Sequence, residues 1–413
     1  MESAVCFGPA DILLPKFIGE PEKGEKWAVI ACDQHTSEPA YWNAVEKIVG
    51  RNPSTLRMIL PEAFLSEMNE QTLSDIAETM RSYEQSVLKK YSGAMIYVRR
   101  TISNGFVRHG VVGAVDLEAY DYRPNSKSPV RATEGTVLTR IPPRVAVRRA
   151  ATLELPHVML LIDDRSHTVI EPLDAQCGGF ARLYSFDLME GGGYIEGYLL
   201  PAEAQKTLEA KMQKLFESSD SSIHFAVGDG NHSLASAKAR YEEFKAELGD
   251  AALTHPLRYA LCEVVNLHDS ALIFEPIFRL VHTAAPKQLL SELAAFGREC
   301  GAGMQSVRCI FDGAEREISL GAGTHRLTVG TLQNFLDRYQ VGHPEMEVDY
   351  IHGEDTLRKL AQAKSSVGFL FGGMDKEELF AAVEQSGALP RKTFSMGDAC
   401  DKRYYIECRK ITE

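Results

Sequence analysis

Short apolar runs that stop abruptly at polar residues are the main pattern along this chain. Residues 223–227 are apolar except for His224, residues 228–233 combine two glycines with four polar side chains, and residues 233–248 have the composition of a helix. This order predicts a buried strand, a tight turn and a helix N-terminus. Comparable short runs predict further strands at residues 27–31, 158–162 and 260–265.

Helical spacing of apolar residues alternates with β-rich stretches over the rest of the chain. Apolar positions at helical spacing predict a long helix or a helix pair over residues 62–90. Further helices are expected at 202–217, 285–299, 354–364 and 375–387, and β-rich pieces at 94–99, 107–117, 136–147, around 393 and at 404–408. This mixture predicts an α+β fold with mixed sheets rather than a regular doubly wound sheet. We expect a main domain at residues 1–280 and a smaller C-terminal α/β unit at residues 281–413.

Composition restricts the class of protein. The chain has 413 residues, of which 44% are hydrophobic and 25% charged, as in a soluble globular protein with two or three substructures. The net charge of -12 argues against a sequence-independent nucleic-acid binder, which requires a basic face. No segment reaches the ~20 apolar residues of a membrane span, and the N-terminal residues do not resemble a signal peptide. Eight scattered cysteines without a C-x-x-C pair indicate reduced thiols, so we expect a cytoplasmic protein, with no membrane partner, that is free to form an oligomer.

The junction at residues 228–233, called the box below, is the strongest candidate site. Its members are Gly228, Asp229, Gly230, Asn231, His232 and Ser233. The backbone N–H groups and the positive end of the following helix suit a phosphate, and glycines permit positive φ and close approach of a ligand. The alternative is an ordinary capped helix start. A cap needs one polar residue, whereas four beside two glycines favour a phosphate site.

Other segments contain further candidate catalytic and anion-binding residues. Glu134, close to Arg131, suits a general base or a Mg²⁺ ligand, although a turn with a surface ion pair explains the same residues. Arg391 and Lys392 suit an anion clamp, with a solvated loop as the alternative, and Arg279 has the same two interpretations. Two polar residues follow the strand expected at 27–31 and are candidates to line a site: Asp33 and His35.

Several well-known motifs are missing from the sequence. There is no H-E-x-x-H pattern, no G-x-S-x-G elbow and no GxxxxGK[ST] loop. The G-x-G at residues 228–230 has Ser233 where a dinucleotide-binding fingerprint has its third glycine. A zinc protease, an α/β-hydrolase, a P-loop enzyme and a Rossmann dehydrogenase are therefore not indicated.

A set of segments spread over nearly the whole chain resembles one bacterial family. They include PADILLPK, KWAVIACDQHTSEPAYW, NPSTLRMILPE, RATEGTVLTRIPPR, LPHVMLLIDD, GDGNHSLASAK, HPLRYALCEVVNLHD, EPIFRLV, YIHGED and LPRKTFSMGD. In content and order they resemble the family known as domain of unknown function ten-fifteen. More distantly, the box is similar to the phosphate-binding box of the ParB/sulfiredoxin superfamily, which includes kinases of free serine. This resemblance implies a ParB/sulfiredoxin-like core.

The box departs from the common form of that family, which resembles Asp-Gly-His-His-Arg. Asn231 stands in place of the first histidine and Ser233 in place of the arginine. Losing the arginine removes one phosphate-binding cation, so its role would shift to Arg131, Lys392 or a metal. Phe278 likewise stands where the family often has histidine before Arg279.

The resemblance implies a nucleotide-dependent phosphotransferase that uses ATP or ADP, with Mg²⁺, on a small metabolite such as free serine. Asp229 and the N–H groups near Gly230 would hold the phosphates, and Asn231 and His232 would contact phosphate or Mg²⁺. Glu134 would be the general base, which requires Asp33, Glu134, Asp229 and Lys392 to converge. Two alternatives use the same pocket: a non-catalytic nucleotide sensor, and a phosphatase of a metabolite such as phosphoserine.

Overall fold

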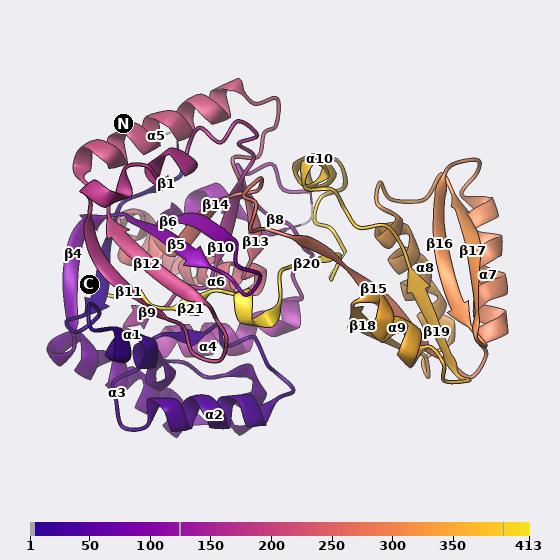
Figure 1. Cartoon of the computed structure of the whole chain (residues 1–413), viewed down its shortest axis with the longest axis horizontal. Helices are drawn as coiled ribbons and strands as arrows, with labels where there is room; N and C mark the ends of the chain where they lie inside the picture. Colours follow the sequence, from indigo (N-terminus) through magenta and orange to yellow (C-terminus); the bar gives the residue numbers. More distant parts are fainter. Residues whose placement is uncertain (1–4, 124, 391) are drawn as a thin grey trace. The chain divides into compact units, whose positions relative to one another are not determined.

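The chain folds into two compact units, each of which is described by itself (Figure 1). The computed structural model describes residues 5–123, 125–390 and 392–413. Unit 1 comprises residues up to 132, residues 136–272 and residues 397–413, and unit 2 comprises residues 133–135 and 273–396. We predicted a boundary near residue 280. By this division it falls between residues 272 and 273, and the last segment of the chain belongs with the first unit.

A large mixed sheet forms the centre of unit 1. Its strand order is β11-β12-β5-β6-β14-β10-β13-β8-β7, with β1 paired to β6. The strands are β1 (Phe7–Gly8), β5 (Ile96–Thr101), β6 (Val107–Asp116), β7 (Tyr120–Asp121), β8 (Val130–Ala132), β10 (Met159–Ile162), β11 (Ala181–Asp187), β12 (Tyr194–Leu199), β13 (Phe225–Asp229) and β14 (Tyr259–Asn266). Around β10 the sheet is mixed, because β10 runs parallel to β14 and antiparallel to β13. The first residues of β13 and all of β10 are buried, which explains their uninterrupted apolar sequences.

Smaller sheets and helices complete unit 1. The remaining strands are β2 (Ala10–Pro15), β3 (Val29–Ile30), β4 (Leu88–Ala94), β9 (Leu153–Glu154), β21 (Tyr404–Tyr405) and β22 (Cys408–Lys410), and the order β4-β2-β22-β9 forms one sheet while β21 pairs with β3. The helices are α1 (Pro21–Trp27), α2 (Pro39–Val49), α3 (Glu70–Ser86), α4 (Ile141–Ala150), α5 (Ala202–Ser218) and α6 (Asn231–Leu248), and the short helices η1 (Thr55–Met58) and η2 (Glu62–Glu67) precede α3. The segment after residue 396 therefore supplies two strands to unit 1.

The structure corrects one predicted element. Residues 136–147 were expected to be β-rich, but most of them form α4. Prolines at the start of this segment fit the first turn of a helix, where the missing N–H costs nothing. Ile141 and Val145 are then one helical turn apart and pack together against Ala235 of α6. The apolar positions are too few to reveal this spacing in the sequence.

Unit 2 has its own sheet and its own core. The sheet order is β17-β16-β19-β15-β18, with β20 also paired to β15. The strands are β15 (Phe274–His282), β16 (Gln305–Phe311), β17 (Ala314–Gly321), β18 (Glu347–His352), β19 (Ser366–Leu370) and β20 (Phe394–Met396), and the helices are α7 (Pro286–Glu299), α8 (Thr328–Gly342), α9 (Glu354–Leu360) and α10 (Leu379–Ser386). A separate cluster of buried side chains, which includes Leu280, Leu293 and Phe369, forms the core. Taken together, the two units give the mixed α+β fold class that the sequence predicted.

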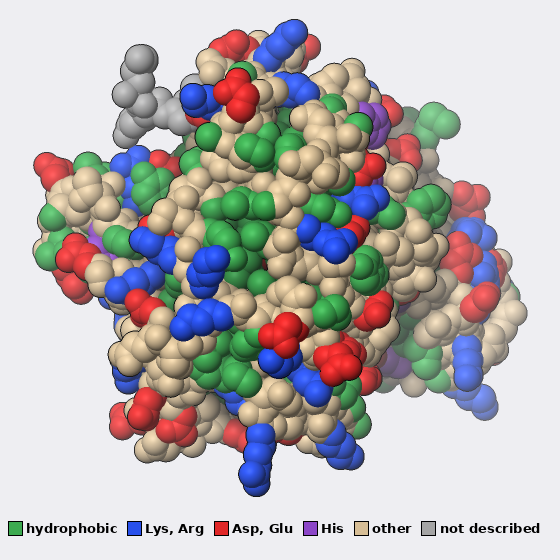
Figure 2. Space-filling view, turned by 60° about the vertical axis from the view of Figure 1, so that its left-hand side comes forward, with side chains coloured by type: hydrophobic (Ala, Val, Ile, Leu, Met, Phe, Trp, Pro, Cys, Tyr) green, Lys and Arg blue, Asp and Glu red, His purple; other side chains and the backbone are tan. Residues whose placement is uncertain are grey.

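The surface carries both signs of charge. On the face drawn in Figure 2, acidic and basic side chains are interspersed, with apolar side chains between them. Across the described part of the chain, no helix has the length and apolar character that a membrane crossing requires.

Candidate functional site

The box forms the sharp turn between β13 and α6 that the sequence predicted. Gly230 occupies the N-cap position with φ 77° and ψ 27°, a left-handed conformation that favours glycine. A Cβ atom at Gly230 would lie 3.0 Å from the Cα atom of Val158 and 3.3 Å from Cδ2 of His157, so the turn is also crowded. Gly228, in contrast, does not have a positive φ. It lies instead at a register shift in which Met159 pairs with Asp229 and Leu160 pairs with Val227.

Three polar side chains of the box make contacts within unit 1. The Asp229 carboxylate accepts a hydrogen bond of 2.9 Å from the Gly230 N–H, and its other oxygen lies 3.7 Å from Nζ of Lys402. Asn231 is buried and its amide donates to the Val227 carbonyl over 3.4 Å. His232 Nε2 accepts a hydrogen bond of 3.2 Å from the Val137 N–H, which places the proton of a neutral ring on Nδ1. Lys402 is thus the cation beside the box.

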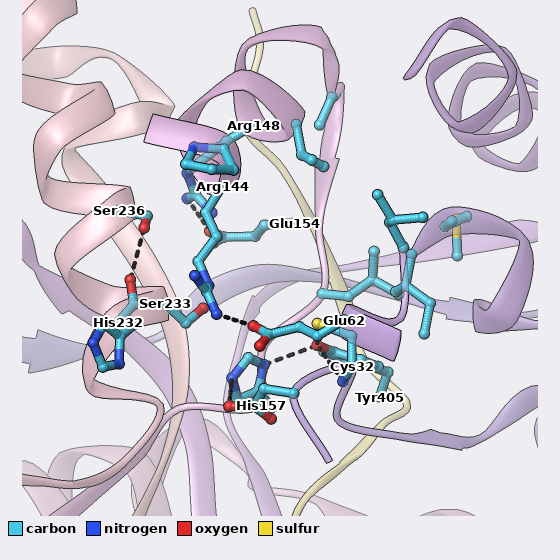
Figure 3. A pocket seen from close by; sticks show the side chains of 18 of the residues that line it. Cys32, Glu62, Arg144, Arg148, Glu154, His157, His232, Ser233, Ser236 and Tyr405 are labelled. Atoms are coloured by element: carbon cyan, nitrogen blue, oxygen red, sulfur yellow. Dashed lines mark hydrogen bonds and ion pairs between the residues drawn. The ribbon is translucent and has the colours of Figure 1, made fainter. Parts of the chain in front are cut away.

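The first turns of α6 open onto a cavity of about 150 Å³ within unit 1 (Figure 3). His232, Ser233 and Ser236 line it from α6. Arg144 and Arg148 line it from α4, and residues from other parts of the chain complete its polar walls: Cys32, Asp33, Glu62, Glu154, His157 and Tyr405. Asp229, Gly230 and Asn231 are not among the residues that line it, so α6 reaches the cavity through the side of its first turns. The positive end of the helix dipole beside these polar groups favours a phosphate there.

A chain of hydrogen bonds runs along one wall of this cavity. His157 Nε2 lies 3.5 Å from Oδ2 of Asp33, and His157 Nδ1 lies 2.9 Å from the hydroxyl of Tyr405. That hydroxyl also donates to Sγ of Cys32 over 3.1 Å and accepts from the Cys32 N–H over 3.2 Å. The chain fixes the His157 ring between an anion and a buried phenol.

Burial and neighbouring charge shift the pKa values of His157 and Asp33 in opposite directions. Burial lowers the pKa of His157, but the charge of Asp33 and the hydrogen bond to it outweigh burial and raise it. Burial raises the pKa of Asp33, but the charge of His157 and its hydrogen bond outweigh burial and lower it. Burial, with the nearby charge of Asp33, raises the pKa of the Cys32 thiol to about 11. The geometry therefore favours an ion pair of Asp33 and His157 beside a neutral thiol.

The arginines of the cavity are paired with carboxylates. Arg144 contacts Glu62, and Arg148 contacts Glu154. Glu154 also accepts from Nε of Arg409 over 2.6 Å and from the Leu261 N–H over 2.9 Å. Burial raises the pKa of Glu154, but the charges of Arg409 and Arg148 outweigh it, so that pKa is lowered. These pairs fix the two arginine side chains along the cavity.

Glu134, Arg279 and Lys392 are the predicted residues that belong to unit 2. Glu134 pairs with Leu389 in an isolated parallel bridge, and its Oε1 accepts a hydrogen bond of 3.2 Å from the Lys392 N–H. Arg279 is fully buried, and its guanidinium donates to Gln333 Oε1 over 2.7 Å and to the Lys392 carbonyl over 3.0 Å. The structure thus brings Glu134 together with Lys392, and Asp33 and Asp229 belong to unit 1. The base role of Glu134 stays a prediction, and Arg391 lies outside the described residues.

Two further predicted residues lie away from the box. Arg131 is buried, and its guanidinium donates to the Ser128 carbonyl and to the Ser222 hydroxyl. Ser222 precedes β13, whereas the box begins at the last two residues of β13, so the Arg131 guanidinium lies toward the opposite end of that strand. His35 stacks on the ring of Tyr41 with centroids 3.7 Å apart and contacts Glu38 over 3.0 Å. Neither residue lines the cavity.

Sequence reasoning missed several residues of the cavity and the box. Arg144 and Arg148 belong to a cluster of four arginines at residues 140–149 that is visible in the sequence. Such a cluster is also typical of a solvated surface, so it did not by itself indicate a site. His157 immediately precedes the run at 158–162, which pairs with the strand leading to the box, and this adjacency was the available signal. Lys402 and Tyr405 have no local signal, because they reach the site through the return of the C-terminal segment to unit 1.

Metal binding was the remaining open question. In the ranges that the structure describes, no three or more His, Cys, Asp or Glu side chains gather in a way that could hold a metal ion. Mg²⁺ is commonly bound through one or two protein carboxylates together with substrate phosphates. Asp229 is the box carboxylate available for such a shared site, and a nucleotide would supply the other oxygens.

Comparisons with known proteins identify a family and structural similarities. The family model described as "Protein of unknown function (DUF1015)" matches residues 16–409. No curated protein matches the chain. A free serine kinase in complex with AMP is similar over 72% of this chain and 91% of its own, with 10% identity and a TM-score of 0.39. A conserved hypothetical protein from Pyrococcus furiosus is similar over 71% of this chain and 93% of its own, with 10% identity and a TM-score of 0.37. Scores this low establish neither an activity nor a ligand for this chain.

Proposed function

Because the chain belongs to the DUF1015 family of proteins of unknown function, we propose its activity from the site itself: a nucleotide-dependent phosphotransferase acting on a small metabolite. One observation carries this proposal. The left-handed turn at Gly230 starts α6 at a cavity whose wall also holds the Asp33–His157 pair. An anion site beside a positioned carboxylate supplies the parts that phosphoryl transfer needs.

The N-terminus of α6 would bind the phosphates of ATP or ADP. Its first-turn N–H groups and helix dipole favour negative charge, and Lys402, 3.7 Å from Asp229, would supply the cation that Ser233 cannot. Asp229 would contact a Mg²⁺ ion that arrives with the nucleotide. Catalysis would then rest on positioning and on neutralising the phosphate charge.

Glu62 and Glu154 on the cavity wall are each paired with an arginine. Asp33, beside His157, is therefore the carboxylate of this wall that would receive the proton of an acceptor hydroxyl. The acceptor oxygen would bond to the terminal phosphorus while the bond from that phosphorus to the bridging oxygen breaks. The shortened nucleotide leaves with that oxygen, and the hydroxyl proton passes to Asp33. Glu134 is the alternative base, predicted from the sequence resemblance. Free serine is the acceptor that the same resemblance suggests.

The first experiment is a thermal-shift titration with ATP and ADP, with and without Mg²⁺. A ligand of the folded state raises stability by about 2.7 kcal/mol at a hundredfold excess over Kd. We expect a shift in the wild type that Asp229→Asn removes. Asp250→Asn, an exposed change just beyond the other end of α6, should keep the shift. Absence of a shift with every nucleotide would refute the proposal.

Turnover then separates catalysis from the alternatives. Phosphoserine formed from serine and a nucleotide would establish a kinase, and other hydroxyl metabolites extend the same assay. Nucleotide binding without turnover would indicate a sensor, and phosphate release from phosphoserine without nucleotide would indicate a phosphatase. Comparing Asp33→Asn with Glu134→Gln decides which carboxylate acts as base, because only the true base should lower kcat by 10²-fold or more, on the order of general-base effects.

A further inference from the structure

The cavity beside the box has an apolar portion that phosphate binding does not explain. Its side chains come from the segment through η1 and η2, from α3 and from the residues around β9. They are Met58, Ile59, Leu60, Leu65, Met80, Leu153 and Leu155. The polar residues labelled in Figure 3 line the same cavity and come from α4, α6, η2, β9 and β21 and from the residues after β3 and β9. The cavity is therefore amphipathic.

The cavity is partly open to solvent, so its volume indicates the size of the group that it covers and not the size of the whole ligand. Its volume of about 150 Å³ is that of a space which accommodates one benzene-sized group. Serine offers no apolar group to this space. A nucleobase in the aliphatic portion would have to turn all its donors and acceptors to the polar wall, because unpaired ones among aliphatic side chains are costly. A hydrocarbon ring or a branched chain of similar size has no such penalty.

We infer that the acceptor carries an apolar group of about one ring in addition to its hydroxyl, and that the enzyme prefers it to free serine. The apolar group would occupy the aliphatic portion of the cavity. The hydroxyl would then lie at the polar wall, where Asp33 and Ser233 both line the cavity. That this molecule is a phosphate acceptor rests on the proposed function. That it carries an apolar group rests on the residues that line the cavity.

Matched ligand pairs test the inference by titration calorimetry on the full chain. Serine is compared with 3-phenylserine, and glycolate with mandelate, so that each pair shares its polar groups and differs by one ring. We expect the ring-bearing member of at least one pair to bind tenfold or more tightly, in line with the discrimination that apolar pockets achieve. Equal affinities within both pairs would overturn the inference.

Cavity-filling variants locate the ring. Val147 is half-buried and lines the cavity from α4, so Val147→Phe should remove the preference for the ring-bearing member. Arg149→Phe is the matched control on the same helix, because the Arg149 side chain is 56% exposed. Ile59→Phe fills the space from another wall if Val147→Phe does not fold. A ring preference that survives filling would also overturn the inference.

The nucleotide shift measured on the same samples separates the two proposals. If nucleotide stabilises the wild type but not Asp229→Asn, and the ligand pairs bind equally, only the proposed class of acceptor is refuted. A ring preference without a nucleotide shift refutes the phosphotransferase, and with it the role of the bound molecule as an acceptor.

Discussion

His157 Nε2 lies 3.5 Å from Oδ2 of Asp33, on the wall of the cavity that His232 and Ser233 of α6 also line. The same ring lies directly beside Gly230, because a Cβ atom at that position would lie 3.3 Å from Cδ2 of His157. The ion pair and the box are therefore parts of one site. Changes to either should affect both stability and ligand binding.

Asp33→Asn should change how stability depends on pH. The pKa of His157 is raised, so its contribution is complete below its unfolded pKa of about 6.5 and is lost as the pH rises through the folded value. The pKa of Asp33 is lowered, so its contribution is complete above about pH 3.9 and is lost as the pH falls through the folded value. Between about pH 3.9 and about pH 6.5, the free energy of unfolding of the wild type should therefore exceed that of Asp33→Asn by about 2 kcal/mol. At higher pH the difference should be smaller.

Urea unfolding at pH 5.5 and pH 8.5 measures that difference. Asp75→Asn changes an exposed carboxylate of α3 and should leave the pH dependence of the wild type intact. A stability gap between wild type and Asp33→Asn that is the same at both pH values would show that the pair does not stabilise the fold as an ion pair.

Tyr405→Phe should destabilise unit 1. The Tyr405 hydroxyl contacts His157 Nδ1, donates to Cys32 Sγ and accepts from the Cys32 N–H, all in a buried position. Removing it leaves buried polar groups unpaired, at a cost of about 1–3 kcal/mol. Denaturant unfolding checks this. Tyr194→Phe, at a ring that is 36% exposed, is the control and should change stability by less than about 0.5 kcal/mol.

The sequence revealed the parts of this site that are encoded locally. The strand, turn and helix at residues 223–248 were predicted, because the apolar run and the glycine–polar turn are contiguous. The contact between Tyr405 and His157 on the cavity wall was not predicted, because the two residues are 248 positions apart in the sequence. Glu134 and Lys392 show a related limit: their pairing in unit 2 depends on a bridge to Leu389 that no local pattern encodes.

Gly230→Ala should disturb the box more than its small size suggests. An alanine in the left-handed region costs roughly 1–2 kcal/mol, and its Cβ would lie 3.0 Å from the Val158 backbone. We expect a lower melting temperature and a weaker nucleotide shift. Gly178→Ala is the matched control, because a Cβ there meets nothing within 4 Å. Equal effects of the two substitutions would show that the turn does not require glycine.

Lys402→Met should weaken nucleotide binding without unfolding the protein. Lys402 Nζ lies 3.7 Å from Asp229 Oδ2, and in the proposal it replaces the arginine that the box lacks. A hydrogen bond to a charged group contributes about 1.5–3 kcal/mol, and 1.4 kcal/mol is tenfold in affinity, so Kd should rise roughly tenfold or more. The fold should tolerate the change, because Arg100 contacts the carbonyl of Lys402 and not its side chain.

Isothermal titration with ATP at two salt concentrations tests the role of Lys402. The affinity of the wild type should fall with added salt more steeply than that of Lys402→Met, because the variant has lost one cation at the phosphates. Lys410→Met is the control, since Lys410 is 41% exposed and pairs with Glu84. An unchanged Kd in Lys402→Met, together with loss of binding in Asp229→Asn, would assign the phosphate charge to another cation, with Arg144 on the cavity wall the next to replace.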